Sequence, residues 1–340
     1  MKRTFLRIAQ ISAAFTLLAI AYERAKPDEL MQQTAAQFLV SLNPDQKKRA
    51  QFRLDDMDER THWLYTPNPR RGLALREMTP AQQQLAEALL SAGLSSQGLI
   101  KAHTIMSLDQ ILYVLEKDGD LERDPTKYYV SVFGEPAGKG PWGYRFEGHH
   151  VSLNYTIVNG KIASTPSFFG SNPAEVLETR RKGLRVLARQ QDTAQRMIDS
   201  LTPAQLTEAV TDKTAPADIL TTNSRKAALN GQPNGLAWAK LTAVQKDLLE
   251  QLVAEYAFDF PPEIAEARLA QFRKVQGQSF FAWAGGVRPG EKRYYRVQTA
   301  EFLIEFDQTQ DNGNHIHSVW RDYKSDWGED LLAAHYRSGH

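Results

Sequence analysis

The histidines are the residues of this sequence with the clearest capacity for chemistry, and two of them form the pattern His315-Ile316-His317. In an extended chain, residues two apart point to the same side, so both imidazoles would face one way. Two imidazoles on one face are a simple strand-borne pair of ligands for a metal ion such as zinc or copper. Such a pair needs at least one further ligand from another part of the chain.

The pair His149-His150 supplies the candidate for this third ligand. Adjacent residues on a strand face opposite sides, so one of the two can point toward the H-x-H pair. His150 is in register with Ser152 on the polar face of its segment, and His149 is in register with Val151 on the apolar face. We therefore predict His150 as the third metal ligand, and His149 as a neighbour that packs behind it.

Two carboxylates and one guanidinium could complete an active site. Glu305 and Asp307 lie on the polar face of a second alternating segment, where they could add oxygen ligands or act as a general base. Arg321 could bind an anionic group of a substrate through two parallel hydrogen bonds. We assign these three residues to catalysis. The residues that we assign to substrate binding are aromatic or amide side chains near the same segments, namely Trp63, Tyr65, Asn154, Asn314 and Trp320.

A bare H-x-H pattern is a weak motif, because strand histidines also donate to backbone carbonyls and bind nothing. Three functions therefore stay open. The first is a metal-dependent enzyme, hydrolytic or oxidative, that acts on a small polar or anionic substrate. The second is a binding protein for a small ligand or a metal ion, without turnover. The third is an interaction or scaffold domain in which the histidines belong to the core.

The composition excludes several classes of partner and of active site. The chain has 340 residues, of which 42% are hydrophobic and 24% charged, as in an ordinary globular protein. Lys and Arg number 41 against 40 Asp and Glu, so the net charge of +1 predicts no nucleic-acid partner. The chain contains no cysteine, which excludes a thiolate nucleophile, a disulfide framework and cysteine-ligated zinc.

Familiar phosphate and nucleophile motifs are also absent from the sequence. It has no P-loop, no G-x-G-x-x-G, no H-E-x-x-H and no G-x-S-x-G. We therefore expect no nucleotide cofactor, and we expect one zinc, copper or iron ion if a cofactor is bound. The expected partner is a small-molecule ligand or substrate, and the sequence does not determine the oligomeric state.

The first 21 residues resemble a secretory signal peptide. Lys2, Arg3 and Arg7 form a basic start, residues 8–21 are mostly apolar, and Ala19-Ile20-Ala21 fits a signal-peptidase site. The apolar stretch is shorter than the roughly 20 residues that a membrane-spanning helix needs. We expect cleavage after Ala21 and a periplasmic or secreted protein without a stable membrane span. An uncleaved N-terminal helix or a short anchor is the alternative.

Two long segments of the chain resemble each other. Residues 144–157 read YRFEGHHVSLNYTI and residues 295–308 read YRVQTAEFLIEFDQ, with apolar residues at the same alternating positions. The helix starts Asn43-Pro44 and Thr79-Pro80 correspond in order to Thr202-Pro203 and Thr242. We therefore predict an internally duplicated α+β protein with repeats at 28–172 and 173–340. Each repeat would have helices followed by an antiparallel sheet, and the two would pack about a pseudo-two-fold axis with a cleft between them. A further helix is expected to begin at Ala174.

Four stretches carry a resemblance to a known family. They are residues 63–67 (WLYTP), 148–154 (GHHVSLN), 167–173 (SFFGSNP) and 314–322 (NHIHSVWRD). In these stretches the chain resembles the uncharacterised family known as domain of unknown function 3500, and the resemblance covers nearly all of the chain after the signal peptide. It implies no activity and no catalytic residues, so the functional argument depends on the residues discussed above.

Overall fold

The fold is described here from a computed structural model for residues 26–115, 123–229 and 231–338. The predicted signal peptide, residues 1–21, lies outside the described residues. None of the described helices combines the length and the apolar character needed to cross a membrane.

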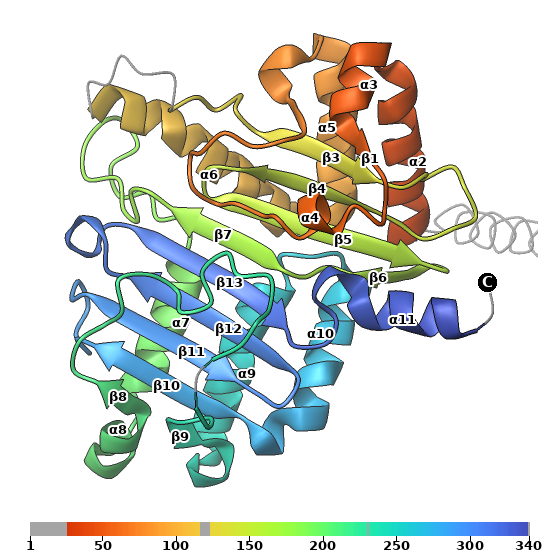
Figure 1. Ribbon diagram of the computed structural model, residues 1–340. Helices are drawn as coiled ribbons and strands as arrows, with labels where there is room; N and C mark the ends of the chain where they lie inside the picture. Colours follow the sequence, from red (N-terminus) through yellow and green to blue (C-terminus); the bar gives the residue numbers. More distant parts are fainter. Residues whose placement is uncertain (1–25, 116–122, 230, 339–340) are drawn as a thin grey trace, which may run out of the picture.

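Thirteen strands of the described chain form one mixed sheet, in which the main path runs β1-β3-β4-β5-β7-β13-β12-β11-β10-β8 (Figure 1). Its strands are β1 (Gln51–Phe52), β2 (Leu73–Ala74), β3 (Tyr129–Phe133), β4 (Trp142–Gly148), β5 (Val151–Val158), β6 (Lys161–Ala163), β7 (Ser167–Ser171), β8 (Val210–Asp212), β9 (Leu236–Ala237), β10 (Phe280–Gly285), β11 (Arg293–Gln298), β12 (Phe302–Gln308) and β13 (Ile316–Asp322). The first-half strands and the second-half strands meet at the antiparallel pair of β7 and β13.

The sequence predicted antiparallel pairing throughout the sheet. The sheet is antiparallel except at its two ends. The short strands β1 and β8 pair in parallel with β3 and β10. A parallel pair requires a crossover connection, and two long helices supply it in each half. Strands of two or three residues show no alternation, so the sequence pattern could not indicate them.

The α-helices begin where the sequence places its caps. They are α2 (Pro27–Ser41), α3 (Pro44–Ala50), α4 (Met57–Arg60), α5 (Pro80–Gly93), α6 (Ser96–Leu115), α7 (Ala188–Asp199), α8 (Pro203–Ala209), α9 (Ala243–Ala257), α10 (Pro262–Val275) and α11 (Glu329–Arg337). The side chains of Asn43, Thr79, Thr202 and Thr242 each accept a hydrogen bond from the third backbone N–H of the following helix. These four predicted helix starts are confirmed.

The helix that we expected at Ala174 does not form, and the next helix, α7, begins at Ala188. The backbone N–H of Ala174 donates to the carbonyl of Asn314 at 2.7 Å, and that of Val176 donates to Leu184 at 3.0 Å. Since these donors are bonded to other segments, the stretch forms a bonded turn region at the start of β13 instead of a helix.

Two pairs of buried or half-buried glutamines make the same contact in each half of the chain. Gln46 and Gln82 exchange side-chain amide hydrogen bonds at 2.9–3.0 Å. Gln205 and Gln245 exchange the same two bonds at 2.9 Å. Each pair joins the first turn of one helix to the first turn of another, so it fixes how the helices of that half meet.

The two faces of the sheet are covered differently. On one face, called the helix face below, lie helices such as α5, α6, α9 and α10, and on the other, the loop face, lie residues 53–72, 213–229 and 231–235 (Figure 1). The guanidinium of Arg145 donates to the carbonyls of Glu59 and His62, which holds the first loop against β4. The carboxylate of Glu305 accepts from the N–H groups of Leu220 and Thr221, which holds the second loop against β12. These loops supply the partners of the histidines described next.

Candidate metal centre

Three histidine nitrogens converge where β5 and β13 begin, at the left in Figure 1. The Nε2 atoms of His150 and His315 are 2.8 Å apart, those of His315 and His317 are 3.1 Å apart, and those of His317 and His150 are 3.3 Å apart. His150 and His317 are buried, and the side chain of His315 is 12% exposed. The trio fulfils the geometric condition for holding a single ion.

His150 reaches the other two from a turn, and not from a strand as predicted. His149 and His150 form the two-residue connection between β4 and β5, and His150 has a positive φ of 62°. Its N–H donates to the carbonyl of Tyr65 at 2.9 Å, and its carbonyl accepts from Gly170 at 2.8 Å. A Cβ on Gly170 would lie 2.7 Å from Cδ2 of His150, so the ring occupies space that only a glycine leaves free.

Two carboxylates determine which ring nitrogens carry protons. Nδ1 of His317 lies 2.6 Å from the carboxylate of Asp218, and Nδ1 of His315 lies 3.0 Å from that of Asp311. An ionised carboxylate only accepts hydrogen bonds, so both Nδ1 atoms must donate. In the neutral imidazole, Nε2 then holds a lone pair, and these lone pairs are directed at the common centre. A carboxylate behind an imidazole is the usual support of a metal-binding histidine.

The electrostatics of the trio favour a cation at its centre. Burial and the neighbouring histidines lower the pKa of His150 well below its usual value. Burial and the neighbouring His317 together lower the pKa of His315 to about 4, although Asp311 opposes this shift. These imidazoles are therefore neutral at pH 7, which is the form that binds metals. Lone pairs that face one another at such short range repel, and a positive ion between them removes the repulsion.

The spacing of the trio suits a transition metal. Zinc binds histidine nitrogens at about 2.1 Å, which separates the ligand atoms by about 3.4 Å in a tetrahedral site and about 3.0 Å in an octahedral one. Two of the observed separations, 3.1 and 3.3 Å, fall between these values, and the third, 2.8 Å, is slightly shorter. Three protein ligands leave at least one coordination position for water or a substrate, as in catalytic zinc sites.

A pair of carboxylates lies beside His317. Asp218 and Asp307 each place an oxygen within 4.8 Å of the other and of a nitrogen of His317. Burial and the charge of Asp218 together raise the pKa of Asp307 to about 7, although the hydrogen bond from Thr309 opposes this shift. Burial also raises the pKa of Asp218, but the contact with His317 and the hydrogen bonds from Ile219 and Tyr65 together outweigh this, so the net shift of the pKa is downward. Asp218 is therefore the ionised member, and Asp307 can exchange a proton near neutral pH.

The family comparison covers all of these residues. The family described as "Protein of unknown function (DUF3500)" matches residues 24–329. The chain belongs to this family. Comparisons of this DUF3500 protein with curated proteins and with solved structures gave no match.

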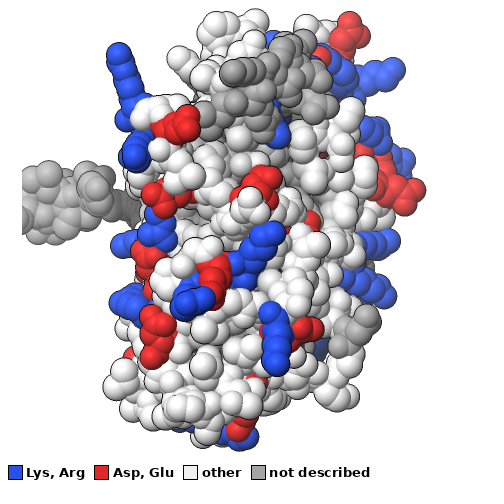
Figure 2. Space-filling model, turned by 90° about the vertical axis from the view of Figure 1, so that its left-hand side faces the viewer, with Lys and Arg blue, Asp and Glu red and all other residues white. Residues whose placement is uncertain are grey.

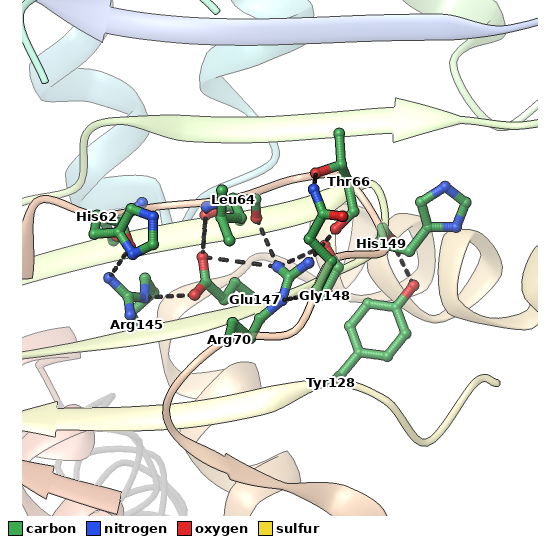
Figure 3. A network of polar contacts seen from close by, with 12 residues as sticks. His62, Leu64, Thr66, Arg70, Tyr128, Arg145, Glu147, Gly148 and His149 are labelled. Atoms are coloured by element: carbon green, nitrogen blue, oxygen red, sulfur yellow. Dashed lines mark hydrogen bonds and ion pairs between the residues drawn. The ribbon is translucent and has the colours of Figure 1, made fainter. Parts of the chain in front are cut away.

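Tyr65, predicted from the sequence as a substrate-binding residue, lies against the metal candidate. Its hydroxyl donates to Asp218 at 3.1 Å, and its ring meets the edge of His317 at a centroid distance of 5.0 Å. Figure 3 shows how its loop is held. Arg70 donates to the carbonyls of Leu64 and Thr66, and the N–H of Leu64 donates to Glu147 at 3.0 Å.

His149, which we predicted to pack behind the third ligand, lies next to His150. Its ring stacks on that of His150 with centroids 3.8 Å apart, and its Nδ1 contacts Asp109 at 2.6 Å. The hydroxyl of Tyr128 donates to the carbonyl of His149 at 2.6 Å (Figure 3). The turn that carries His150 is thus fixed by bonds from three elements.

The other predicted site residues do not reach the histidines. Both oxygens of Glu305 accept hydrogen bonds from the loop at Leu220 and Thr221. The guanidinium of Arg321, fully buried, pairs with Asp326 at 2.6 Å. The remaining substrate-binding candidates make structural contacts. Trp63 packs in a buried apolar cluster with Tyr65 and Phe168, and Asn154 donates to the carbonyl of Pro166. Asn314 forms hydrogen bonds with the backbone of Glu175, and Trp320 stacks on Phe302 on the helix face.

Three carboxylates at the site had no role in the sequence analysis. Asp218 lies in the aperiodic stretch 213–235, Asp311 in the turn before the H-x-H pattern, and Asp109 on α6. The one available signal was the position of Asp311, four residues before His315. Asp218 and Asp109 are brought to the site by tertiary packing alone.

The surface around the centre is electrically mixed. Figure 2 shows the side of the molecule on which β5 and β13 begin, and basic and acidic side chains alternate over it. No broad area of a single charge is present on the face shown, which agrees with the near-zero net charge of the chain.

Proposed function

We propose that this protein is a metal-dependent enzyme in which His150, His315 and His317 hold one ion. The observation that carries the proposal is the convergence of three Nε2 atoms, two of them forced by carboxylates to present lone pairs. An imidazole-only set favours zinc or copper. It lacks the carboxylate of the two-histidine, one-carboxylate sites that are typical of non-haem iron.

The neighbouring carboxylates favour hydrolysis. A zinc ion with an open position lowers the pKa of bound water to about 7 and so generates hydroxide at neutral pH. Asp307, whose own pKa is raised to about 7 by burial, is suited to accept and return the proton of that water. Tyr65 and Asp218 would orient His317 during the reaction. We propose a small polar or anionic substrate that enters near the partly exposed His315.

We also propose that the chain is an internal duplication and that the site lies where its halves meet. The strand order is the same from each end of the sheet toward β7 and β13. Tyr144 and Tyr155 are paired across β4 and β5, and Tyr295 and Phe306 are paired across β11 and β12. The second pair follows the first by 151 residues at both positions (295 − 144 = 306 − 155 = 151). His150 then comes from one half, and the H-x-H pair from the other.

We further propose that the protein is exported, because residues 1–21 have the pattern of a cleavable signal. N-terminal sequencing of the protein from its own host should begin at Tyr22. A mature chain that still begins at Met1 would contradict export by this route.

Elemental analysis tests the metal centre. Untagged protein should contain about one zinc or copper ion per chain after gel filtration. The ion should be lost from folded His315→Ala and His317→Ala variants and kept by the control His103→Ala, which removes an exposed histidine. A protein that holds no metal, even after dialysis against zinc, copper and iron salts, would refute the centre.

The variant Asp307→Asn separates an enzyme from a binding protein. It should keep the metal and lose about 100-fold or more of the hydrolysis rate, measured with p-nitrophenyl acetate and bis(p-nitrophenyl) phosphate. If the metal-loaded wild type hydrolyses neither of these compounds, hydrolysis is wrong and a metal-binding protein is the better description.

A further inference from the structure

A pocket of about 590 Å³ lies far from the histidines, at the right in Figure 1 where β6, α10 and α11 approach one another. It opens on the helix face of β13, where Trp320 and Asp322 line it. His317 is on the loop face of the same strand, because residues an odd number apart point to opposite sides. The pocket and the metal candidate are therefore separate sites, on opposite faces of the sheet.

Arg268 of α10 lines this pocket and is 5% exposed. Its Nη2 donates to the carbonyl and hydroxyl of Ser164 at 2.8 and 2.9 Å. Its guanidinium lies between the rings of Phe260 and Trp320, 3.9 and 4.7 Å from their centroids. Its Nη1 is buried and has no hydrogen-bond partner in the described part of the chain.

This guanidinium forms no ion pair with a carboxylate of the described residues. Burial lowers its pKa, and acidic groups that include Asp259 and Asp322 offset this only in part, so that the pKa is about 10. Buried charges in proteins are normally paired, because an unpaired one has lost its hydration without replacement. A buried guanidinium with a free donor beside a cavity therefore has the properties of a receptor for an anion.

The corresponding cation in the first half does have a partner. The Nζ of Lys101 on α6 lies 5.5 Å from the ring centroid of Phe169, and it pairs with Asp259 at 2.5 Å. The difference of 151 in residue number that relates β5 to β12 also relates Phe169 to Trp320. The guanidinium of Arg268 lies over the ring of Trp320. The two buried cations thus occupy matching places. One has a protein carboxylate, and the other has a cavity.

We propose that this pocket binds a small monocarboxylate, whose carboxylate group pairs with Arg268 and whose apolar part fills the cavity. Apolar side chains that would contact it are Ile162, Ile264, Trp320 and Leu331. The pocket also has four carboxylates against two lysines, namely Asp28, Glu263, Asp322 and Asp330 against Lys26 and Lys161. With Arg268 included, the lining has four negative against three positive groups, so it offers no surplus of positive charge for a doubly charged anion such as phosphate, and a single carboxylate is the better match.

Calorimetry with octanoate and phenylacetate tests the proposal on the full-length mature protein. At least one of them should bind with one site per chain, and inorganic phosphate and octylamine should not bind. Affinity should fall at least tenfold in Arg268→Lys, which keeps the charge but loses the planar fork, and further in Arg268→Met. The control Lys240→Met, which removes an exposed lysine outside the pocket, should leave the affinity unchanged.

Thermal melts show whether each variant is still folded. Without a ligand, Arg268→Met should lower Tm less than Lys101→Met, because the lysine substitution leaves Asp259 buried and unpaired. His315→Ala should keep full carboxylate affinity, which separates this proposal from the metal centre. The proposal is overturned if neither carboxylate binds at millimolar concentration, if phosphate binds equally well, or if the folded Arg268 variants keep wild-type affinity.

Discussion

Replacing Asp218 with asparagine should weaken metal binding by about 10- to 100-fold, which corresponds to about 1.4 to 2.7 kcal/mol. The structural reason is the 2.6 Å contact between the carboxylate of Asp218 and Nδ1 of His317. The contact is shielded, because the side chain of His317 is 4% exposed and that of Asp218 is 29% exposed. An asparagine amide can donate as well as accept, so it no longer forces Nε2 of His317 to present a lone pair.

The measurement is zinc affinity by competition with a chromophoric chelator at pH 7. Two further substitutions calibrate the result. Asp311→Asn should cost less than Asp218→Asn, because the carboxylate of Asp311 is 59% exposed and lies 3.0 Å from its histidine. Asp192→Asn removes a surface carboxylate of the same charge that pairs with Arg185, and it should leave affinity unchanged.

Equal affinities for Asp218→Asn and the wild type, with both proteins folded, would refute the reasoning about tautomers. A loss of the same size in Asp192→Asn would show that net charge, and not the orientation of His317, determines the affinity. Tyr65→Phe keeps the ring against His317 and removes the hydroxyl that donates to Asp218 at 3.1 Å. It should therefore lose less affinity than Asp218→Asn.

Two further predictions concern stability. Gly170→Ala should lower the free energy of unfolding by about 1 to 3 kcal/mol in urea melts, because its Cβ would lie 2.7 Å from the ring of His150, whereas Gly277→Ala, with open space around it, should not. In the metal-free protein, the lowered pKa values of His150 and His315 mean that the unfolded state binds more protons below about pH 6.5, so these two histidines make stability rise with pH from about 4 to 6.5. The raised pKa of Asp307 acts in the opposite direction between its usual 3.8 and about 7, so Asp307→Asn should steepen that rise, and melts across this pH range that show the same slope in both proteins would contradict the assignment.

The sequence predicted best what depends on local chemistry. A cap residue followed by proline satisfies the first N–H groups of a helix wherever it occurs, so the helix starts at Pro44, Pro80 and Pro203 were confirmed. Alternation located β5 and β12, because strands with one apolar side must alternate. The grouping of His150 with the H-x-H pair also agrees with the structure.

The same alternation does not hold at His149 and His150, which lie in a turn. The alternating pattern applies to β5, which begins at Val151, and not to the two turn residues before it, because side chains in a turn do not point to alternate sides. The positive φ of His150 lets both rings stack at 3.8 Å, which no pair of adjacent strand residues can do. His150 was therefore grouped with the H-x-H pair by an argument that does not apply to its conformation.

The partners of the histidines could not be predicted, because they depend on contacts between distant segments. Asp218 reaches His317 across 99 residues of chain. Its loop is held in place by backbone N–H groups that donate to Glu305, a bond that leaves no trace in the pattern of side chains. The conformation of a long irregular loop depends on such individual hydrogen bonds, whereas helices and strands are formed by hydrogen bonds that repeat along the chain.

Glu305 and Asp307 illustrate how environment assigns different roles to similar residues. Both are carboxylates on the loop face of β12, two positions apart, and the sequence offers no means to distinguish them. Glu305 accepts two backbone N–H bonds and the hydroxyls of Thr221 and Tyr294, so its oxygens are committed to structure. Asp307 accepts from the hydroxyl of Thr309 and lies beside a second carboxylate, which leaves it an incomplete set of donors and a pKa raised to about 7. A buried carboxylate with few donors has a raised pKa and can exchange a proton near neutral pH, and for that reason we assign the proposed proton-transfer role to Asp307 and not to Glu305.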